Sequence, residues 1–261
     1  NPVRATLGLL RLARERRETW LTIQGISWFW ALGIILLAQI IPLTEVVLQG
    51  STRVATLLLA TFSIGIAIGS AAIARILRGR PSAQFAPLFA LVMALALLGL
   101  CLALATYQPP PAIVGLRGFL AHGAAWPVLI LFFLLAVAGG AYSVPLYTLL
   151  QAGTEPATRA RVIAANNVVN ALYMAAGSVA AGLVMAMSNG SFLALFLLLG
   201  LATLAAATLI VSLLPDELLK SLLQALFRLL YRVEVTGLEH YERAGARSVI
   251  VVNHISFIDG A

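Results

Sequence analysis

The side chains best suited to acid–base chemistry lie near the end of the chain, in the stretch VIVVNHISFIDGA that begins at Val249. His254 is followed five positions later by Asp259. A carboxylate that holds an imidazole fixes its tautomer and stabilises the imidazolium, so such a pair can act as a general base toward a hydroxyl group. In one continuous helix the two side chains would point roughly 140° apart. We therefore expect a turn between them, with Ser256 as a helix cap.

Two short strands are the elements expected to position this pair. Val233 to Gly237 alternates apolar and polar residues, and Ser248 to Val252 reads as a more buried strand. Together they predict that residues 233–261 begin a soluble α/β domain. About thirty residues cannot bury an independent core, so we expect this domain to continue beyond Ala261. With three histidines in the chain, a His and an Asp at this spacing also arise by chance in about 15% of cases at average aspartate usage.

Most of the remaining chain has the composition of a membrane protein. Hydrophobic residues make up 61% of the 261 positions and charged residues 10%, against about 25% charged in an ordinary soluble domain. The only cysteine, Cys101, lies in an apolar stretch, so no disulfide can form within the chain. Residues 20–215 contain six apolar segments of the roughly 20 residues that a helix needs to cross a bilayer: Trp20–Ile41, Val54–Leu77, Ala83–Tyr107, Trp126–Leu150, Val162–Met187 and Phe192–Leu214.

The basic residues are distributed unequally between the two sides that these spans define. If the spans alternate in direction, 15 of the 17 lysines and arginines share one side and only Arg53 and Arg117 lie opposite. Cytoplasmic loops retain positive charge, so this asymmetry predicts a multi-pass protein with both ends in the cytoplasm. The net charge of +7 therefore requires no nucleic-acid partner.

Small and polar residues inside the spans give two further expectations. Small residues allow close approach of helices in lipid and predict a packed bundle; they are Gly65, Gly69, Ser70, Ala71, Gly139, Gly140, Ala141, Gly177, Ser178 and Gly182. Asn166 and Asn170 share a face one turn apart, and Tyr142 precedes Pro145 in the fourth span. These polar residues either line a cavity that binds a substrate headgroup or fasten the bundle through hydrogen bonds between helices.

Two segments flank the spans. Residues 1–19 form a basic cytoplasmic lead-in. Residues 216–232 predict an amphipathic helix, in which Lys220, Gln224, Arg228 and Arg232 recur every four positions opposite a leucine-rich face. Such a helix either lies at an anionic membrane surface or packs on the next domain.

The six spans and their basic loops resemble the C-terminal half of a major facilitator superfamily transporter. The loop GSAAIARILRGR after the second span is similar to the glycine- and arginine-rich signature of that family, with Gly69, Arg75 and Arg78 in place but without its aspartate, and a basic TRAR loop follows the fourth span. Such transporters consist of two six-helix halves that hold the substrate near the midplane. The resemblance therefore implies an N-terminal transporter half as a partner of this chain.

The terminal stretch resembles the glycerophospholipid acyltransferases of the lysophosphatidic acid acyltransferase type. Asn253-His254-Ile255-Ser256-Phe257-Ile258-Asp259 matches their first motif, with Val233 to Gly237 at a fitting distance upstream. By this resemblance His254 deprotonates a hydroxyl of a lysophospholipid or acylglycerol phosphate, Asp259 orients the histidine, and the acyl group comes from acyl-CoA or acyl carrier protein, without a metal or a tightly bound cofactor. The later motifs of the family lie beyond Ala261, so this chain by itself is expected to be inactive.

Together the two parts resemble bacterial fusion proteins that couple lysophospholipid import to reacylation. The expected fold is an all-α polytopic membrane protein followed by an amphipathic helix and an incomplete α/β acyltransferase domain. The expected location is the bacterial cytoplasmic (inner) membrane, in contact with membrane lipids. Two rival hypotheses are a transporter of another small solute with a non-catalytic tail, and a membrane anchor that transports nothing.

Overall fold

The computed structural model describes residues 2–78 and 82–213, together with the single positions 219, 223, 226, 227, 230 and 243. The chain divides into two compact units, Asn1–Leu222 and Leu223–Ala261. Within the described residues the structure contains eight helices and no strand. The two predicted strands and most of the predicted amphipathic helix at 216–232 lie outside them.

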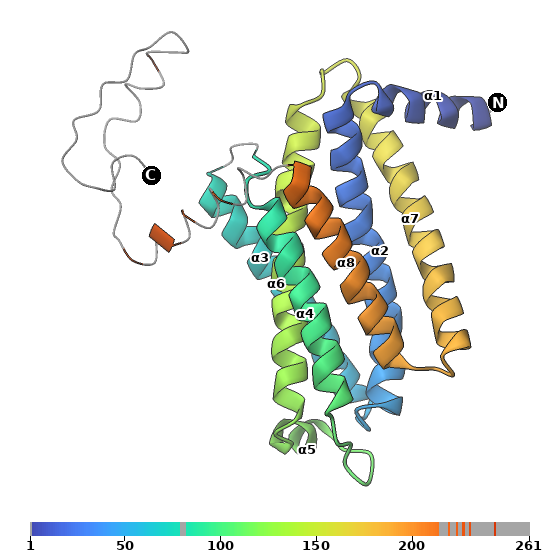
Figure 1. Ribbon diagram of the computed structural model, residues 1–261, viewed down its shortest axis with the longest axis vertical. Coiled ribbons are helices and arrows are strands. Elements are labelled where there is room, and N and C mark those ends of the chain that lie inside the picture. Colours follow the sequence, from blue (N-terminus) through green and yellow to red (C-terminus); the bar gives the residue numbers. More distant parts are fainter. Residues whose placement is uncertain are drawn as a thin grey trace. The chain divides into compact units, whose positions relative to one another are not determined.

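Six of the helices are long and apolar enough to cross a membrane, which confirms the predicted number of spans. Even the shortest has 20 residues, and at 1.5 Å per residue this length matches the roughly 30 Å hydrocarbon core. They are α2 (Arg17–Val46), α3 (Thr52–Leu77), α4 (Ala86–Ala105), α6 (Ala125–Ala152), α7 (Arg159–Met187) and α8 (Phe192–Leu213) (Figure 1). Two shorter helices are α1 (Pro2–Arg14) and α5 (Leu116–Ala121).

The first span is longer than the sequence suggested. The predicted end at Ile41 precedes a proline, but α2 continues through Pro42 to Val46. Proline removes one backbone donor from a helix, yet Leu43 and Thr44 are both fully buried and the Thr44 hydroxyl donates to the carbonyl of Ile40 at 2.7 Å. Tertiary packing therefore holds the last turn.

The six spans pack as a row of four helices with two more on one side. The principal contacts join α3 to α6, α6 to α2 and α2 to α7, which makes the row, while α4 packs on α6 and α8. In Figure 1, α4 and α8 lie in front of the row. In chain order the six spans form two triplets, α2–α3–α4 and α6–α7–α8. The middle helix of each triplet packs on the first helix of the other, so that α3 contacts α6 and α7 contacts α2.

Glycines bring α3 and α6 into backbone contact. A Cβ atom added to Gly140 would overlap the carbonyl oxygen of Ile66, and one added to Gly65 would lie 2.6 Å from the Cβ of Ala136. This confirms the packing role predicted for Gly65 and Gly140, whereas Ala71 of the second span is exposed and does not pack within the described bundle. In the fifth span Gly177 lies near Ile35, but a Cβ on Gly182 would meet nothing within 4 Å, so Gly182 does not pack within the described bundle.

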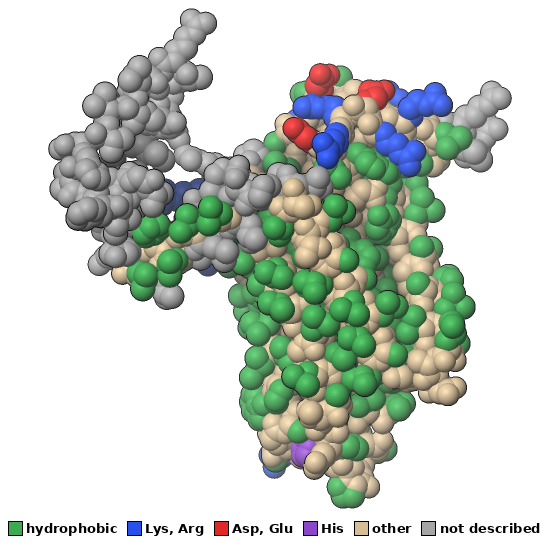
Figure 2. All heavy atoms as spheres, viewed as in Figure 1, with side chains coloured by type: hydrophobic (Ala, Val, Ile, Leu, Met, Phe, Trp, Pro, Cys, Tyr) green, Lys and Arg blue, Asp and Glu red, His purple; other side chains and the backbone are tan. Residues whose placement is uncertain are grey.

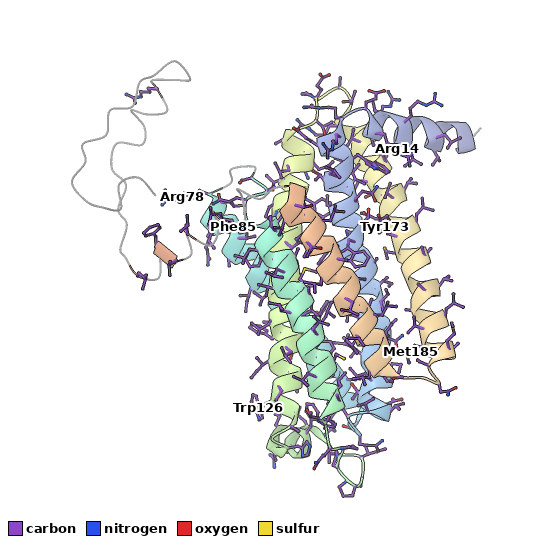
Figure 3. All side chains as sticks on the ribbon, viewed as in Figure 1. Arg14, Arg78, Phe85, Trp126, Tyr173 and Met185 are labelled. Atoms are coloured by element: carbon purple, nitrogen blue, oxygen red, sulfur yellow. The ribbon has the colours of Figure 1, made fainter. Side chains whose placement is uncertain are left out.

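The charged side chains of the described residues gather at the two ends of the bundle, and most lie at one end (Figure 2). That end carries the start of α2, the α6–α7 loop and the end of α3. Trp20 lies there, and Trp126 begins α6 at the opposite end, as expected for residues that favour membrane interfaces. Figure 3 shows Arg14 and Trp126 at these two ends.

A small polar cluster around Tyr107 lies at the opposite end of the bundle. Its hydroxyl donates to the carbonyl of Leu48 at 3.3 Å, and its ring makes an edge contact with His122 at 5.4 Å between centroids. A ring nitrogen of His122 lies 2.9 Å from the carbonyl of Gln108. Burial raises the pKa of Tyr107. His122 directly follows α5.

Candidate functional site

The predicted catalytic residues lie outside the described part of the chain. This applies to His254 and Asp259 and to the supporting motif residues Asn253 and Ser256. Their roles therefore stay predictions. The site that the structure does describe is the polar cluster inside the membrane bundle.

Polar side chains connect α2 and α7 in the half of the bundle nearer to Arg14. The Ser27 hydroxyl donates to Oδ1 of Asn170 at 2.7 Å, and both residues are buried. The Tyr173 hydroxyl donates to Oε1 of Gln24, and Figure 3 shows Tyr173 on α7 in the same half of the bundle. Because these groups have no water to bond in the hydrocarbon layer, each contact favours the α2–α7 pairing. Asn170 therefore does bond between helices, one of the two roles predicted for it.

Asn166 differs from Asn170 because its hydrogen-bonding capacity is not used within the bundle. It is 1% exposed. Its Nδ2 reaches Oδ1 of the exposed neighbour Asn167 only at 3.5 Å, and its own Oδ1 is buried without a partner. An unpaired buried acceptor costs about 1–3 kcal/mol. Asn166 is therefore the residue of this cluster whose polarity the described fold does not explain.

Tyr142 lies in the core of the bundle, facing α2. It is 1% exposed, and a Cβ added to Gly25 would stand 2.8 Å from its hydroxyl oxygen. The glycine thus makes room for the tyrosine. Among the described residues none forms a hydrogen bond with this hydroxyl. Tyr142 and Asn166 are both buried, so a ligand reaches them only if the bundle opens or if the ligand enters between helices.

A further polar contact, between Trp30 and Tyr147, was not predicted from the sequence. Nε1 of Trp30 donates to the hydroxyl of Tyr147 at 2.6 Å, joining α2 to α6. Trp30 is 41% exposed, so this pair lies at an open surface of the row of helices. The α2–α7 hydrogen bonds had a signal in the sequence, which is helical spacing. Gln24 and Ser27 share one face of α2, and Asn166, Asn170 and Tyr173 share one face of α7.

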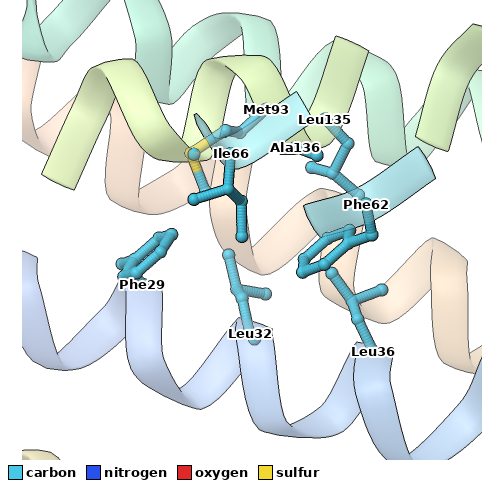
Figure 4. A pocket seen from close by; sticks show the side chains of 10 residues that line it. Phe29, Leu32, Leu36, Phe62, Ile66, Met93, Leu135 and Ala136 are labelled. Carbon is cyan, nitrogen blue, oxygen red and sulfur yellow. The ribbon is translucent and has the colours of Figure 1, made fainter. Parts of the chain in front are cut away.

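A narrow apolar pocket lies beside this cluster, between α2, α3, α4 and α6 (Figure 4). Phe29, Leu32 and Leu36 of α2 point across it toward Phe62 and Ile66 of α3. Its cavity volume of about 10 Å³ corresponds to a single water molecule. Since its walls are apolar and its space is small, the polar cluster is the better candidate for ligand recognition.

The candidate site contains no charged group and no metal ligands. The six spans contain no Lys or Asp, and their Arg and Glu side chains occur only toward the helix ends. In residues 2–78 and 82–213 no three His, Cys, Asp or Glu side chains come together as a metal site would require. The arrangement can therefore bind through neutral hydrogen bonds from amides, hydroxyls and indole.

Fold and site together define an all-α polytopic membrane protein. Six apolar helices pack through glycine contacts, and a neutral polar cluster joins three of them. No family model, curated protein or solved structure matches the chain significantly. The class of protein thus follows from its own helices and their contacts.

Proposed function

We propose that this chain is half of a lysophospholipid transporter joined to the beginning of an acyltransferase domain in the bacterial inner membrane. The observation that carries the transporter part is an unpartnered surface on the outer helices of the row, α3 and α7. On α3 one line of exposed residues at helical spacing consists of small residues, with the exposed Ile64 and Ile68 beside it: Thr56, Ala60, Ser63, Ala67, Ala71 and Ala74. On α7 the corresponding stripe is Ala171, Ala175, Ser178, Gly182 and Ala186.

The small residues of these two stripes favour contact of α3 and α7 with further helices rather than with lipid. Bulky residues such as Ile64 and Val179 flank the stripes. Small residues in a membrane helix allow another helix to approach closely, and they gain nothing from contact with lipid. A second six-helix half, placed against α3 and α7, would cover both stripes at once. This is the arrangement expected of a two-half transporter with its substrate near the midplane.

The polar cluster supports a substrate with a polar headgroup. Asn166, Asn170 and Tyr142 are the proposed headgroup ligands, and the unpaired Oδ1 of Asn166 is an acceptor that the bundle itself leaves free. The exposed Trp30–Tyr147 pair provides further polar atoms near the proposed partner half. The absence of charged residues within the cluster suits a ligand whose charges remain near the interface.

The acyltransferase part of the proposal is supported by the sequence motif at Asn253 to Asp259. His254 acts as general base on the hydroxyl of the lysophospholipid, and Asp259 holds its tautomer. The hydroxyl oxygen attacks the thioester of acyl-CoA or acyl carrier protein, and the thiol leaves. Tethering the enzyme to the transporter gives the imported lipid a high effective concentration at the reacylation site.

The test uses the complete parent protein reconstituted in liposomes, with uptake and acylation of a labelled lysophospholipid measured separately. His254→Ala should abolish acylation and leave uptake unchanged, whereas the control His240→Ala should affect neither. Acylation that persists in His254→Ala would remove this residue from the mechanism. Absence of lysophospholipid uptake by the unmodified protein would favour the transporter of another solute.

A further inference from the structure

The basic lead-in contains a helix, α1, that the sequence analysis did not predict. In Figure 1, α1 lies across the end of the bundle, and it contacts both α2 and α7. Ala13 is fully buried, and Leu9, Leu10 and Leu12 pack against the core of the bundle. The leucine-rich face of α1 is therefore already occupied, and its position is fixed by the bundle.

A second contact holds the junction of α1 and α2 in place. Nη1 of Arg16 donates to the carbonyl oxygen of Gly153, in the loop between α6 and α7, at 2.8 Å. This bond ties the start of α2 to the end of α6. The outward face of α1 is thus presented in a defined orientation at the level where α2 enters the membrane.

The outward face of α1 combines positive charge with one exposed leucine. Leu7, Arg11 and Arg14 follow one another at helical spacing, all three are exposed, and Leu7 is 56% exposed. Neither arginine forms an ion pair with a carboxylate among the described residues. An exposed apolar side chain among free guanidinium groups is typical of a helix that lies at a lipid headgroup layer.

Arg14 is held at that layer by an aromatic ring. Its guanidinium carbon lies 4.6 Å from the centroid of the Trp20 ring, a cation–π contact. Trp20 belongs to the start of α2, where tryptophan favours the membrane interface. Among the described residues none accepts a hydrogen bond from Arg14, so its N–H groups are available, and these donors match phosphate oxygens.

We propose that Arg11, Arg14 and Trp20, with Leu7, form a binding surface for the phosphate headgroups of anionic lipids in the leaflet at the arginine-rich end of the bundle. Arg17 and Arg161 are also exposed at this end, and together with the arginines of α1 they outnumber its exposed carboxylates, which are Glu15, Glu18 and Glu155. Leu7 and Trp20 select a lipid surface over a soluble anion, since both insert at the depth of headgroups. This surface is independent of the transport and acylation proposed above.

The experiment follows a fluorescent label on α1 in the full chain. Gly8→Cys in a Cys101→Ala background places an environment-sensitive probe beside Leu7, at an exposed position where a Cβ atom would meet nothing within 4 Å, and mixed micelles of neutral detergent are titrated with phosphatidylglycerol or with phosphatidylcholine. The probe should report binding of phosphatidylglycerol only. Arg11→Gln with Arg14→Gln should weaken this response roughly 30-fold, because each basic residue near an anionic surface contributes on the order of a five-fold factor.

Two controls separate the proposal from its alternatives. Arg53→Gln with Arg117→Gln removes the same charge at the opposite end and should leave the titration unchanged; an equal loss in both double variants would overturn a defined surface on α1. Inorganic phosphate at matched concentration should give no response, and a response equal to that of the lipid would overturn the choice of lipid. Unchanged helical circular dichroism and melting of the α1 variant in neutral micelles show that a lost response is not unfolding.

Discussion

Gly69 of α3 lies so close to α6 that a Cβ atom added to it would overlap the carbonyl oxygen of Val137 and stand 2.8 Å from its carbonyl carbon. The obstacle is backbone and not a flexible side chain. Two helices of the row can approach to this distance only with glycine at position 69, and the partner glycine Gly140 repeats the arrangement against Ile66. The α3–α6 contact therefore depends on glycine at both positions.

Gly69→Ala should destabilise the bundle by about 1–3 kcal/mol, because inserting a methyl group into a packed contact forces the backbones apart. The measurement is thermal or denaturant unfolding in detergent micelles. Gly33→Ala is the matched control, since a Cβ at Gly33 meets nothing within 4 Å. Equal melting of the two variants would show that the α3–α6 approach is not required.

The hydrogen bond between Ser27 and Asn170 should contribute measurably to the pairing of α2 with α7. A double-mutant cycle with Ser27→Ala and Asn170→Ala should give a coupling of about 0.6 kcal/mol, and at most about 1.7, as for other polar contacts between membrane helices. The cycle is measured by unfolding in micelles. Strictly additive effects of the two changes would place this bond outside the interactions that stabilise the bundle.

Asn166→Leu should separate binding from stability. Removing a buried acceptor that has no partner removes a desolvation cost, so the melting temperature should stay constant or rise. Lysophospholipid uptake by the complete parent protein should fall, because the proposed headgroup ligand is lost. Gln151→Leu makes the same kind of change at an exposed amide near the end of α6 and is the control. A lower melting temperature with unchanged uptake would assign Asn166 to the bundle alone.

Bulky substitution in the stripe on α3 should block assembly with the proposed second half without unfolding the chain. Ala67→Leu adds volume on an exposed surface, so this chain should melt as before, while uptake by the complete parent protein should decrease strongly. Ala205→Leu makes the same change at an exposed position of α8, outside both stripes, and should be neutral. If Ala67→Leu leaves uptake unchanged, α3 faces lipid.

The sequence by itself determined the number of spans, because a length of about 20 apolar residues is a local property that the bilayer thickness imposes. It also determined the concentration of positive charge on one side and the small residues that allow close helix packing. The boundaries depended on tertiary contacts: the sequence ended the first span before Pro42, whereas packing of Leu43 and Thr44 extends α2 to Val46.

Only the tertiary structure decided which helices meet and what each polar residue contacts. Asn166 and Asn170 lie one helical turn apart on the same face, yet Asn170 bonds to Ser27 whereas Asn166 keeps an unpaired acceptor. Gly69 and Gly182 look alike in sequence, but one touches the backbone of α6 and the other lies open. Helical periodicity tells which residues share a face, while the neighbour of that face is set by long-range packing that no local pattern encodes.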